Sequence, residues 1–208
     1  MSFFPDRPFA SGADYGRAYF EQIAKAAGGI DFTALSAAAE ILLAASLERA
    51  EIFSCGNGGS AAIANHLACD CMKGVQAGTA LKPRVHSLSS NIELISAIVN
   101  DIGVEEMFSY QLRTLARPGD VLVAISSSGN SSNILHALKM ARELEVKTIA
   151  FTGFDGGEAS RLADVAIHVP AANYGVVEDV HQSLMHILAQ YVRHKSLKGT
   201  ASLGKVKF

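Results

Sequence analysis

Two segments rich in glycine and serine contain the residue types best suited to bind an anion. The first, residues 54–60, reads Ser-Cys-Gly-Asn-Gly-Gly-Ser, and the second, residues 125–131, reads Ile-Ser-Ser-Ser-Gly-Asn-Ser. Each segment follows a short apolar run and precedes a helical pattern. Backbone N–H groups, small hydroxyls and a helix N-terminus are therefore available at both places. This pattern predicts a phosphate-binding site.

The two segments do not support that prediction equally. Any strand-to-helix turn requires glycine, so the first segment alone has an equally good structural explanation. The second segment supplies four hydroxyls in six residues, which is more than helix capping requires, whereas a phosphate ester uses several donors at once. We therefore expect the phosphate to be bound by Gly58, Gly59, Ser60, Ser126, Ser127, Ser128 and Ser131.

Neither segment has the features of a nucleotide-binding loop. No Gly-Lys-Ser/Thr follows either of them, the first lacks the third glycine of a dinucleotide fingerprint, and no acidic residue ends the next predicted strand. Both segments also lack lysine and arginine. Binding of a dianion by dipoles and neutral donors is typical of phosphosugar sites, and no nucleotide cofactor is expected.

Titratable side chains recur at helical spacing on two predicted helices. His66 and Asp70 are four residues apart on the helix after the first segment. Glu178, Gln182 and His186 form a second row with this spacing on the last predicted helix. If the last helix packs beside the first segment, these side chains converge on one ligand.

Composition indicates one globular domain with a small partner. The chain has 208 residues, 18% of them charged and 49% apolar, with a formal net charge of −2. These values indicate neither disorder nor nucleic-acid binding. No apolar run approaches the length of a membrane span and no signal peptide is evident, so a cytoplasmic protein is expected. The three cysteines favour buried apolar roles over a zinc site.

The order of apolar runs and helical patterns predicts an α/β fold. Residues 13–28 and 32–49 are expected to form an N-terminal helical hairpin within residues 1–50, used in subunit packing. Residues 51–195 alternate strands with helices, as in a parallel sheet covered on both faces. The strands are predicted at 52–55, 84–88, 121–126, 148–152 and 165–169, the helices at 59–73, 91–101, 104–116, 131–144 and 176–195, and a flexible tail at 196–208.

Several motifs in this order resemble the sugar isomerase (SIS) domain family, and within it the phosphoheptose isomerase group. They include residues 56–62, His66, Asn100-Asp101, residues 119–131, residues 151–157, and His181 with His186. The resemblance covers about residues 13–195. It implies a single flavodoxin-like SIS domain over residues 1–208, with three layers and a five-stranded parallel sheet, and a homotetramer with active sites shared between subunits.

The resemblance also implies a reaction and its residues. The expected reaction converts sedoheptulose 7-phosphate into D-glycero-D-manno-heptose 7-phosphate through an enediolate, which requires one group to move a carbon-bound proton and another to act on oxygen. Asp70 would be the base and His186 the partner acid, with roles that could be exchanged. Asn57, Asp101 and Glu178 would join the substrate-binding residues. Some members bind zinc at positions that correspond to His66, Asp70, Glu178 and His186.

Two departures from the family pattern affect this expectation. Asp70 occupies a position where the group has glutamate, and Glu178 one where it usually has glutamine. SIS domains also occur as phosphosugar sensors and as adaptors that bind a replication initiator, but those usually lack the acid and histidine positions. The presence of His66, Asp70 and His186 favours an enzyme over a non-catalytic binding protein.

Overall fold

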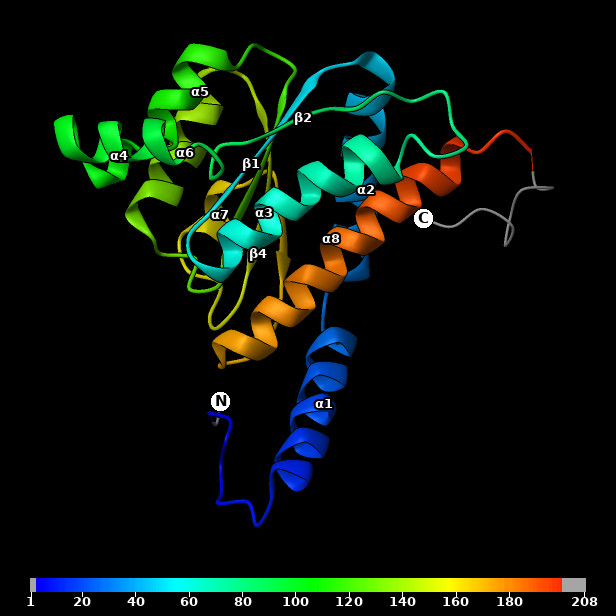
Figure 1. The fold of residues 1–208 in the computed structure, drawn as a ribbon, viewed down its shortest axis with the longest axis vertical. Coiled ribbons are helices and arrows are strands. Elements are labelled where there is room, and N and C mark those ends of the chain that lie inside the picture. The colour runs from blue at the N-terminus through cyan, green and yellow to red at the C-terminus, as the bar shows by residue number, and fades with distance from the viewer. Residues whose placement is uncertain (1–2, 200–208) are drawn as a thin grey trace.

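The computed structural model describes residues 3–199 as an α/β fold (Figure 1). Its elements follow in the order α1 (Gly12–Gly28), α2 (Phe32–Glu48), β1 (Glu51–Gly56), α3 (Gly59–Cys69), η1 (Asp70–Gly74), β2 (Arg84–Ser87), α4 (Ile92–Asp101), η2 (Val104–Glu106), α5 (Ser109–Leu115), β3 (Val121–Ser126), α6 (Ser132–Glu143), β4 (Lys147–Thr152), α7 (Ala159–Leu162), β5 (Val165–His168) and α8 (Tyr174–Ser196).

The five strands form one parallel sheet in the order β2-β1-β3-β4-β5. Gly56, at the end of β1, is in register with Ile125 near the end of β3. The two glycine- and serine-rich segments therefore leave the sheet side by side. The strand order also reverses between β1 and β3, and doubly wound sheets bind their ligands at such a point. The predicted flavodoxin-like sheet is confirmed.

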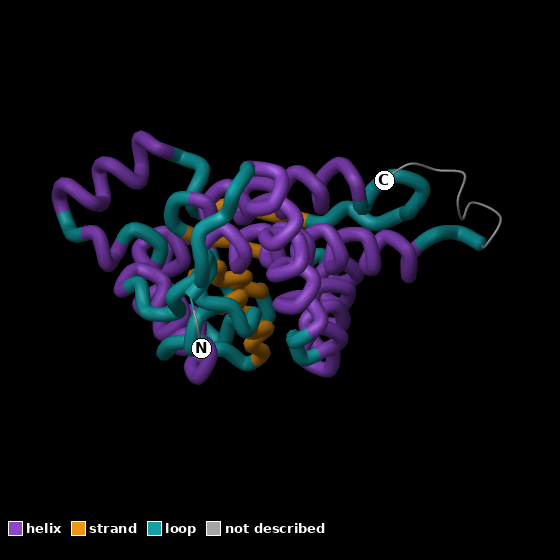
Figure 2. Tube along the Cα trace, turned by 90° about the horizontal axis from the view of Figure 1, so that it is seen from below, coloured by secondary structure: helices purple, strands orange, loops and turns teal. Residues whose placement is uncertain are grey.

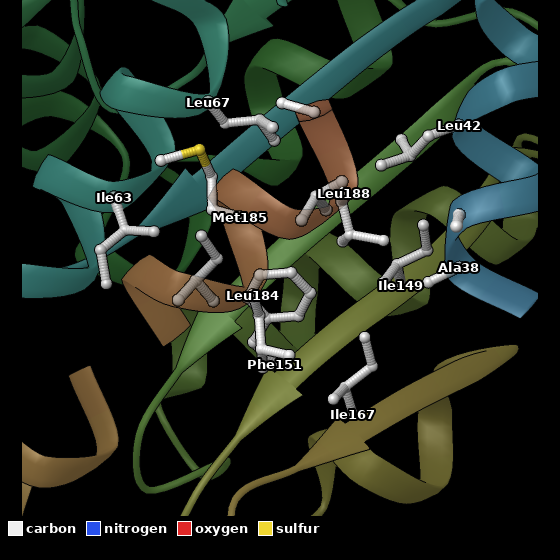
Figure 3. Packing of buried hydrophobic residues seen from close by; sticks show 14 of the residues in the cluster. Ala38, Leu42, Ile63, Leu67, Ile149, Phe151, Ile167, Leu184, Met185 and Leu188 are labelled. Atoms are coloured by element: carbon white, nitrogen blue, oxygen red, sulfur yellow. The ribbon is translucent and has the colours of Figure 1, made fainter. Parts of the chain in front are cut away.

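Helices cover both faces of the sheet in three layers (Figure 2). One face packs against α2, α3 and α8, with α1 packed on α8, and the other against α5, α6 and α7. All six residues of β3 are buried, which explains its continuous apolar run. Figure 3 shows the packing between α2, α3, α8 and the sheet, in which the labelled side chains include Leu42, Ile63, Leu67, Ile149, Phe151, Leu184, Met185 and Leu188.

The N-terminal hairpin has partners within its own chain. The inner face of α2 buries Ala38, Leu42 and Ala45 against the sheet and α8, and α1 also packs on α8. Phe20 and Leu47 remain largely exposed. Packing of this hairpin against another subunit stays a prediction. Within residues 3–199 no single helix is long and apolar enough to cross a membrane, and only the bent pair of α1 and α2 reaches those criteria jointly.

Two predicted helices differ in the structure. The helix expected over 59–73 ends as an α-helix at Cys69 and continues as the π-helical turn η1, which begins at Asp70. The helix expected over 104–116 is divided into the short turn η2 and α5. Part of the predicted C-terminal tail, residues 200–208, lies outside the described residues. The π-helical turn is relevant to function because such turns are frequent at functional sites.

Candidate active site

A cavity of about 110 Å³ lies at the carboxyl ends of β1 and β3, and we name it the cradle. Its position follows from the pairing of these two strands, which brings the loops after them together. Most of the predicted binding residues line it. The lining consists of Asn57, Ser60, Ile125, Ser126, Ser127, Ser128, Ser131, Tyr174 and Glu178.

The cradle contains hydrogen-bonding groups that the protein itself leaves open. The Oγ of Ser127 is buried and has no hydrogen-bond partner, although buried hydroxyls are normally paired. Helices α3 and α6 both begin here, and their N-cap residues, Gly58 and Ser131, make no side-chain capping bond. Gly58 has a φ of 53°, a left-handed conformation that favours glycine. These groups suit an anion that accepts several hydrogen bonds.

Glu178 extends from α8 to the beginning of α3. Its carboxylate lies against the Cα of Gly59, so a Cβ at that position would be 2.6 Å from the Glu178 Cδ. Burial raises the pKa of Glu178, and the charge of the neighbouring Asp179 raises it further. A negative side chain therefore lines a cavity whose other groups favour an anion. The positive end of the α3 dipole partly offsets the repulsion between this carboxylate and a bound anion.

A second group of polar side chains lies between α3 and α8, and we name it the cluster. Its members are His66, Asp70 and His186, whose ligand atoms all lie within 4.8 Å of one another. The Asp70 carboxylate contacts both rings, with Oδ2 at 2.8 Å from His186 Nδ1 and Oδ1 at 3.3 Å from His66 Nε2. The Asp70 side chain is 12% exposed, against 44% for His66 and 35% for His186. The carboxylate is thus the innermost member.

Gln182 contacts both imidazoles of the cluster. Its Nε2 is 3.0 Å from His66 Nδ1 and 3.0 Å from His186 Nε2. Each imidazole therefore contacts Asp70 through one ring nitrogen and Gln182 through the other. The four side chains form a closed ring of contacts that joins α3 to α8.

The packing of α3 on α8 brings these residues together. Apolar side chains on the inner faces of both helices are buried against the sheet, among them Ile63, Leu67, Leu184 and Met185 (Figure 3). The cluster residues flank these apolar side chains where α3 meets α8. Asp70 is the first residue of η1, and its carbonyl accepts the N–H of Val75 across this wider turn.

Comparison with known proteins identifies the family. Residues 16–153 match the SIS domain family. The chain belongs to the SIS domain family. This match ends before α8, so it covers the cradle loops, His66 and Asp70 but not the other residues of the cluster.

Phosphoheptose isomerases are among the relatives of this SIS domain. The chain is 41% identical over 145 residues to the phosphoheptose isomerase of Colwellia psychrerythraea, which covers 68% of this chain and 74% of that protein. The structure of phosphoheptose isomerase from Neisseria gonorrhoeae matches with a TM-score of 0.81 and 33% identity over 88% of this chain and all of that one. The phosphoheptose isomerase from Francisella tularensis matches with a TM-score of 0.79 and 26% identity over 88% of this chain and 96% of that one.

The structure separates some residues that the sequence analysis grouped. Glu178 was expected beside His66, Asp70 and His186, but it lines the cradle and is not part of the three-residue cluster. Asp101 was expected near the sugar, yet it lies exposed at the end of α4, where it accepts a hydrogen bond from Asn100. In Figure 1, α4 lies apart from α3 and α8.

Other site residues escaped the sequence analysis. Asn133 is buried in the first turn of α6 and exchanges two amide hydrogen bonds with Asn57, at 3.0 and 2.9 Å, which tie the two loops together. Tyr174 lines the cradle from the first turn of α8. The sequence signal for Asn133 was an amide side chain only two residues after the serine-rich segment. Nothing in the sequence around Tyr174 indicated its position.

Two remaining groups have structural roles. His181 is fully buried against Phe151, and Nε2 lies 3.1 Å from the Thr152 carbonyl oxygen. Burial lowers the pKa of His181 to about 4, so the ring is neutral at pH 7. Cys55 and Cys71 are buried, which raises the pKa of both thiols. These two cysteines act as small apolar residues, as the sequence indicated, whereas Cys69 is exposed, so the expectation of a buried role was wrong for that residue.

Proposed function

We propose that this chain is an aldose–ketose isomerase of sugar phosphates and that its substrate is sedoheptulose 7-phosphate, which it converts into D-glycero-D-manno-heptose 7-phosphate through an enediolate. One observation carries the proposal: an anion cradle with unsatisfied donors lies on the same helix pair as a cluster of two imidazoles and a carboxylate. The relatives named phosphoheptose isomerase support the same class of reaction.

The spacing of the two sites supports a long sugar chain. Ser60 lines the cradle and His66 belongs to the cluster, and both lie on α3. Six residues of α-helix rise by about 9 Å. An extended seven-carbon sugar with its phosphate in the cradle can place its first two carbons beside the imidazoles. A shorter sugar phosphate would leave its carbonyl carbon between the two sites.

The contacts in the cluster favour His186 as the base that moves the proton between C1 and C2. Asp70 accepts contacts from both rings, so its oxygens are occupied, whereas His186 Nε2 faces away from it. A carboxylate behind an imidazole orients the ring and stabilises its charged form, as in other acid–base sites. Asp70 would then orient and His66 would act on the substrate oxygen. This proposal differs from the expectation of the sequence, in which Asp70 and His186 share the roles of base and acid, because it gives Asp70 an orienting role and His66 the action on oxygen.

The cluster also suits a divalent cation such as Zn²⁺. Two imidazoles and a carboxylate with ligand atoms within 4.8 Å match the donor types of a first-row metal site. His66, Asp70 and His186 would hold the ion, and Glu178 would join them only by leaving Gly59. A bound cation would polarise the carbonyl and hydroxyl oxygens of the sugar. A coordinated imidazole lone pair cannot accept a proton, so the cation-bound form and proton transfer by His186 would be alternative uses of the cluster.

The same geometry would allow a phosphosugar-binding sensor or adaptor, because the cradle alone suffices for binding. The proposal also includes a homotetramer whose sites are completed by neighbouring subunits. In such a tetramer the exposed Asp101 would contact the sugar bound at a neighbouring subunit.

The deciding experiment measures turnover and proton exchange together. Purified protein would be incubated in deuterated water with sedoheptulose 7-phosphate, with and without Zn²⁺, while NMR follows aldose formation and deuterium entry at C1 and C2. The proposal expects both signals, and lower rates on pentose and hexose phosphates. Binding without exchange on any of these sugars would support the sensor or adaptor and refute the enzyme.

A further inference from the structure

The amide of Gln182 occupies the space between the two imidazoles of the cluster. Its Nε2 lies 3.0 Å from a ring nitrogen of His66 and 3.0 Å from one of His186. An amide group has two N–H donors on that nitrogen, so one side chain can satisfy both rings. The His66 and His186 rings meet edge to face with their centroids 4.9 Å apart.

The Asp70 carboxylate decides the direction of these hydrogen bonds. An ionised carboxylate only accepts, so His186 Nδ1, which hydrogen-bonds to Asp70 Oδ2 at 2.8 Å, carries the proton of that contact, and His66 Nε2 is the nitrogen of its ring that faces the same carboxylate, 3.3 Å from Oδ1. In a neutral ring with that proton, the opposite nitrogen carries a lone pair; these nitrogens are His66 Nδ1 and His186 Nε2. Only the N–H₂ side of the Gln182 amide can face both lone pairs. The reverse amide orientation would require two imidazolium rings side by side.

We propose that Gln182 is a positioning residue that holds the His66 and His186 rings through their lone pairs and closes these lone pairs to a cation or a substrate proton until its amide swings away. The inference rests on the proposed function, because the two lone pairs it covers are those assigned to metal binding and proton transfer. Gln182 is partly exposed and holds the cluster through contacts with His66 and His186, so the amide has room to leave.

This arrangement predicts that Gln182 competes with a divalent cation. A cation needs both lone pairs, so its binding must break two hydrogen bonds that Gln182 makes. Methionine has a similar length and no N–H donor. The Gln182→Met variant should therefore bind Co²⁺ or Zn²⁺ at least about tenfold more tightly than the wild type, which is the scale of one to two hydrogen bonds.

The test uses the full-length protein after chelator treatment. Co²⁺ binding would be followed by visible absorption and Zn²⁺ binding by calorimetry, without any sugar phosphate. Long-range ¹H–¹⁵N NMR on the metal-free protein would report the ring nitrogens: both wild type and Gln182→Met should show His66 protonated at Nε2 and His186 at Nδ1, because Asp70 remains. In Gln182→Met the ¹⁵N resonances of His66 Nδ1 and His186 Nε2 should shift, because these two nitrogens lose the Gln182 N–H donors. These readouts do not depend on turnover.

Matched controls keep the interpretation clear. Gln190→Met changes an exposed glutamine on the same helix and should leave metal affinity and the ring ¹⁵N resonances unchanged. His186→Ala should lose the cation. Unchanged affinity in Gln182→Met, weaker affinity because the Gln182 carbonyl oxygen is itself a ligand, or cation binding that survives His186→Ala would each overturn the inference. Absence of isomerase turnover with the expected metal and ring-nitrogen results would instead refute the proposed function alone.

Discussion

The cradle and the cluster are built in different ways, although they share α3 and α8. The cradle consists of loop backbone and short hydroxyl side chains at the ends of two neighbouring strands, and Ser126 and Ser127 are both about 95% buried. The cluster consists of long side chains that meet across two helices and remain partly exposed. The cradle is preformed by the sheet, whereas the cluster depends on how two helices pack.

This difference suggests a division of tasks. A rigid cradle can bind the phosphate with little reorganisation, because its donors are already in place and one of them has no internal partner. The three cluster residues and Gln182 contact one another through side chains that can change partners, and this suits groups that must move protons. Glu178 lies at the boundary, with its carboxylate at the beginning of α3.

The largest expected effect separates the two tasks at the cluster. His186→Ala removes the proposed base and should lower kcat by about 10²–10⁴-fold, the usual contribution of general acid–base catalysis. The cradle is untouched, so the affinity for sugar phosphate should change little. Stopped assays of aldose formation and calorimetry with the substrate would measure both. His194→Ala, an exposed histidine on the same helix, is the control. A large loss of affinity with normal kcat would reverse the assigned tasks.

The second effect concerns the hydroxyl without a partner in the cradle. Ser127→Ala should weaken phosphate-ester binding by about 10-fold to 100-fold, because a hydrogen bond to a charged group contributes about 1.5–3 kcal/mol. The free energy of unfolding should not fall, since the folded protein loses no hydrogen bond. KM and urea unfolding would be measured together.

Ser54→Ala provides the contrast for Ser127→Ala. The Ser54 hydroxyl is also buried but donates to the Ala64 carbonyl at 2.9 Å, so its loss should cost about 1 kcal/mol of stability. If Ser127→Ala is the variant that loses stability and keeps its KM, the cradle does not bind the phosphate.

The contrast between the two regions also explains what the sequence could predict. The serine-rich segment could be identified from the sequence because strand pairing alone places Ser126–Ser128 at the carboxyl end of the central strand β3. His66 and Asp70 were paired by helical spacing, and the structure confirms that they meet. Local rules of strand and helix geometry were sufficient for these residues.

Contacts between elements far apart in sequence were harder to predict. The placement of Glu178 against Gly59 depends on the rotation of α8 about its axis, because a carboxylate one turn away from Gln182 meets a different neighbour. The spacing of residues on α8 shows which side chains share a face but not which of them meets α3. The π-helical turn at Asp70 left no signal in the apolar periodicity.

A smaller effect is expected at the contact that joins the cradle to α8. Gly59→Ala would place a methyl group where the Glu178 carboxylate lies and push that negative charge toward the phosphate position. We expect KM to rise about tenfold, which corresponds to about 1.4 kcal/mol, with kcat nearly unchanged. Gly28→Ala is the control, because a Cβ at that helical glycine meets nothing within 4 Å. A fall in kcat at constant KM would place Glu178 in the cluster instead.

The smallest effect tests the charge of Glu178 itself. Its pKa is raised in the folded protein, so the ionised form is less favourable there than in the unfolded chain. The folded state loses stability as pH rises from the ordinary glutamate value of 4.5 through the raised pKa, and this cost is absent below pH 4.5. Glu178→Gln removes the cost.

At pH 7 we expect Glu178→Gln to gain on the order of 0.5 kcal/mol, because the α3 dipole and solvent already offset part of the unfavourable charge. At pH 4 the gain should disappear. Urea unfolding at the two pH values measures this difference, and inhibition by inorganic phosphate, which should become stronger at pH 7, measures the same charge from within the cradle. Equal gains at both pH values would mean that packing, not charge, sets the effect. A loss of stability in Glu178→Gln at pH 7 would show instead that the ionised carboxylate stabilises the N-terminus of α3. Glu178 would then line the cradle because of its contribution to the helix.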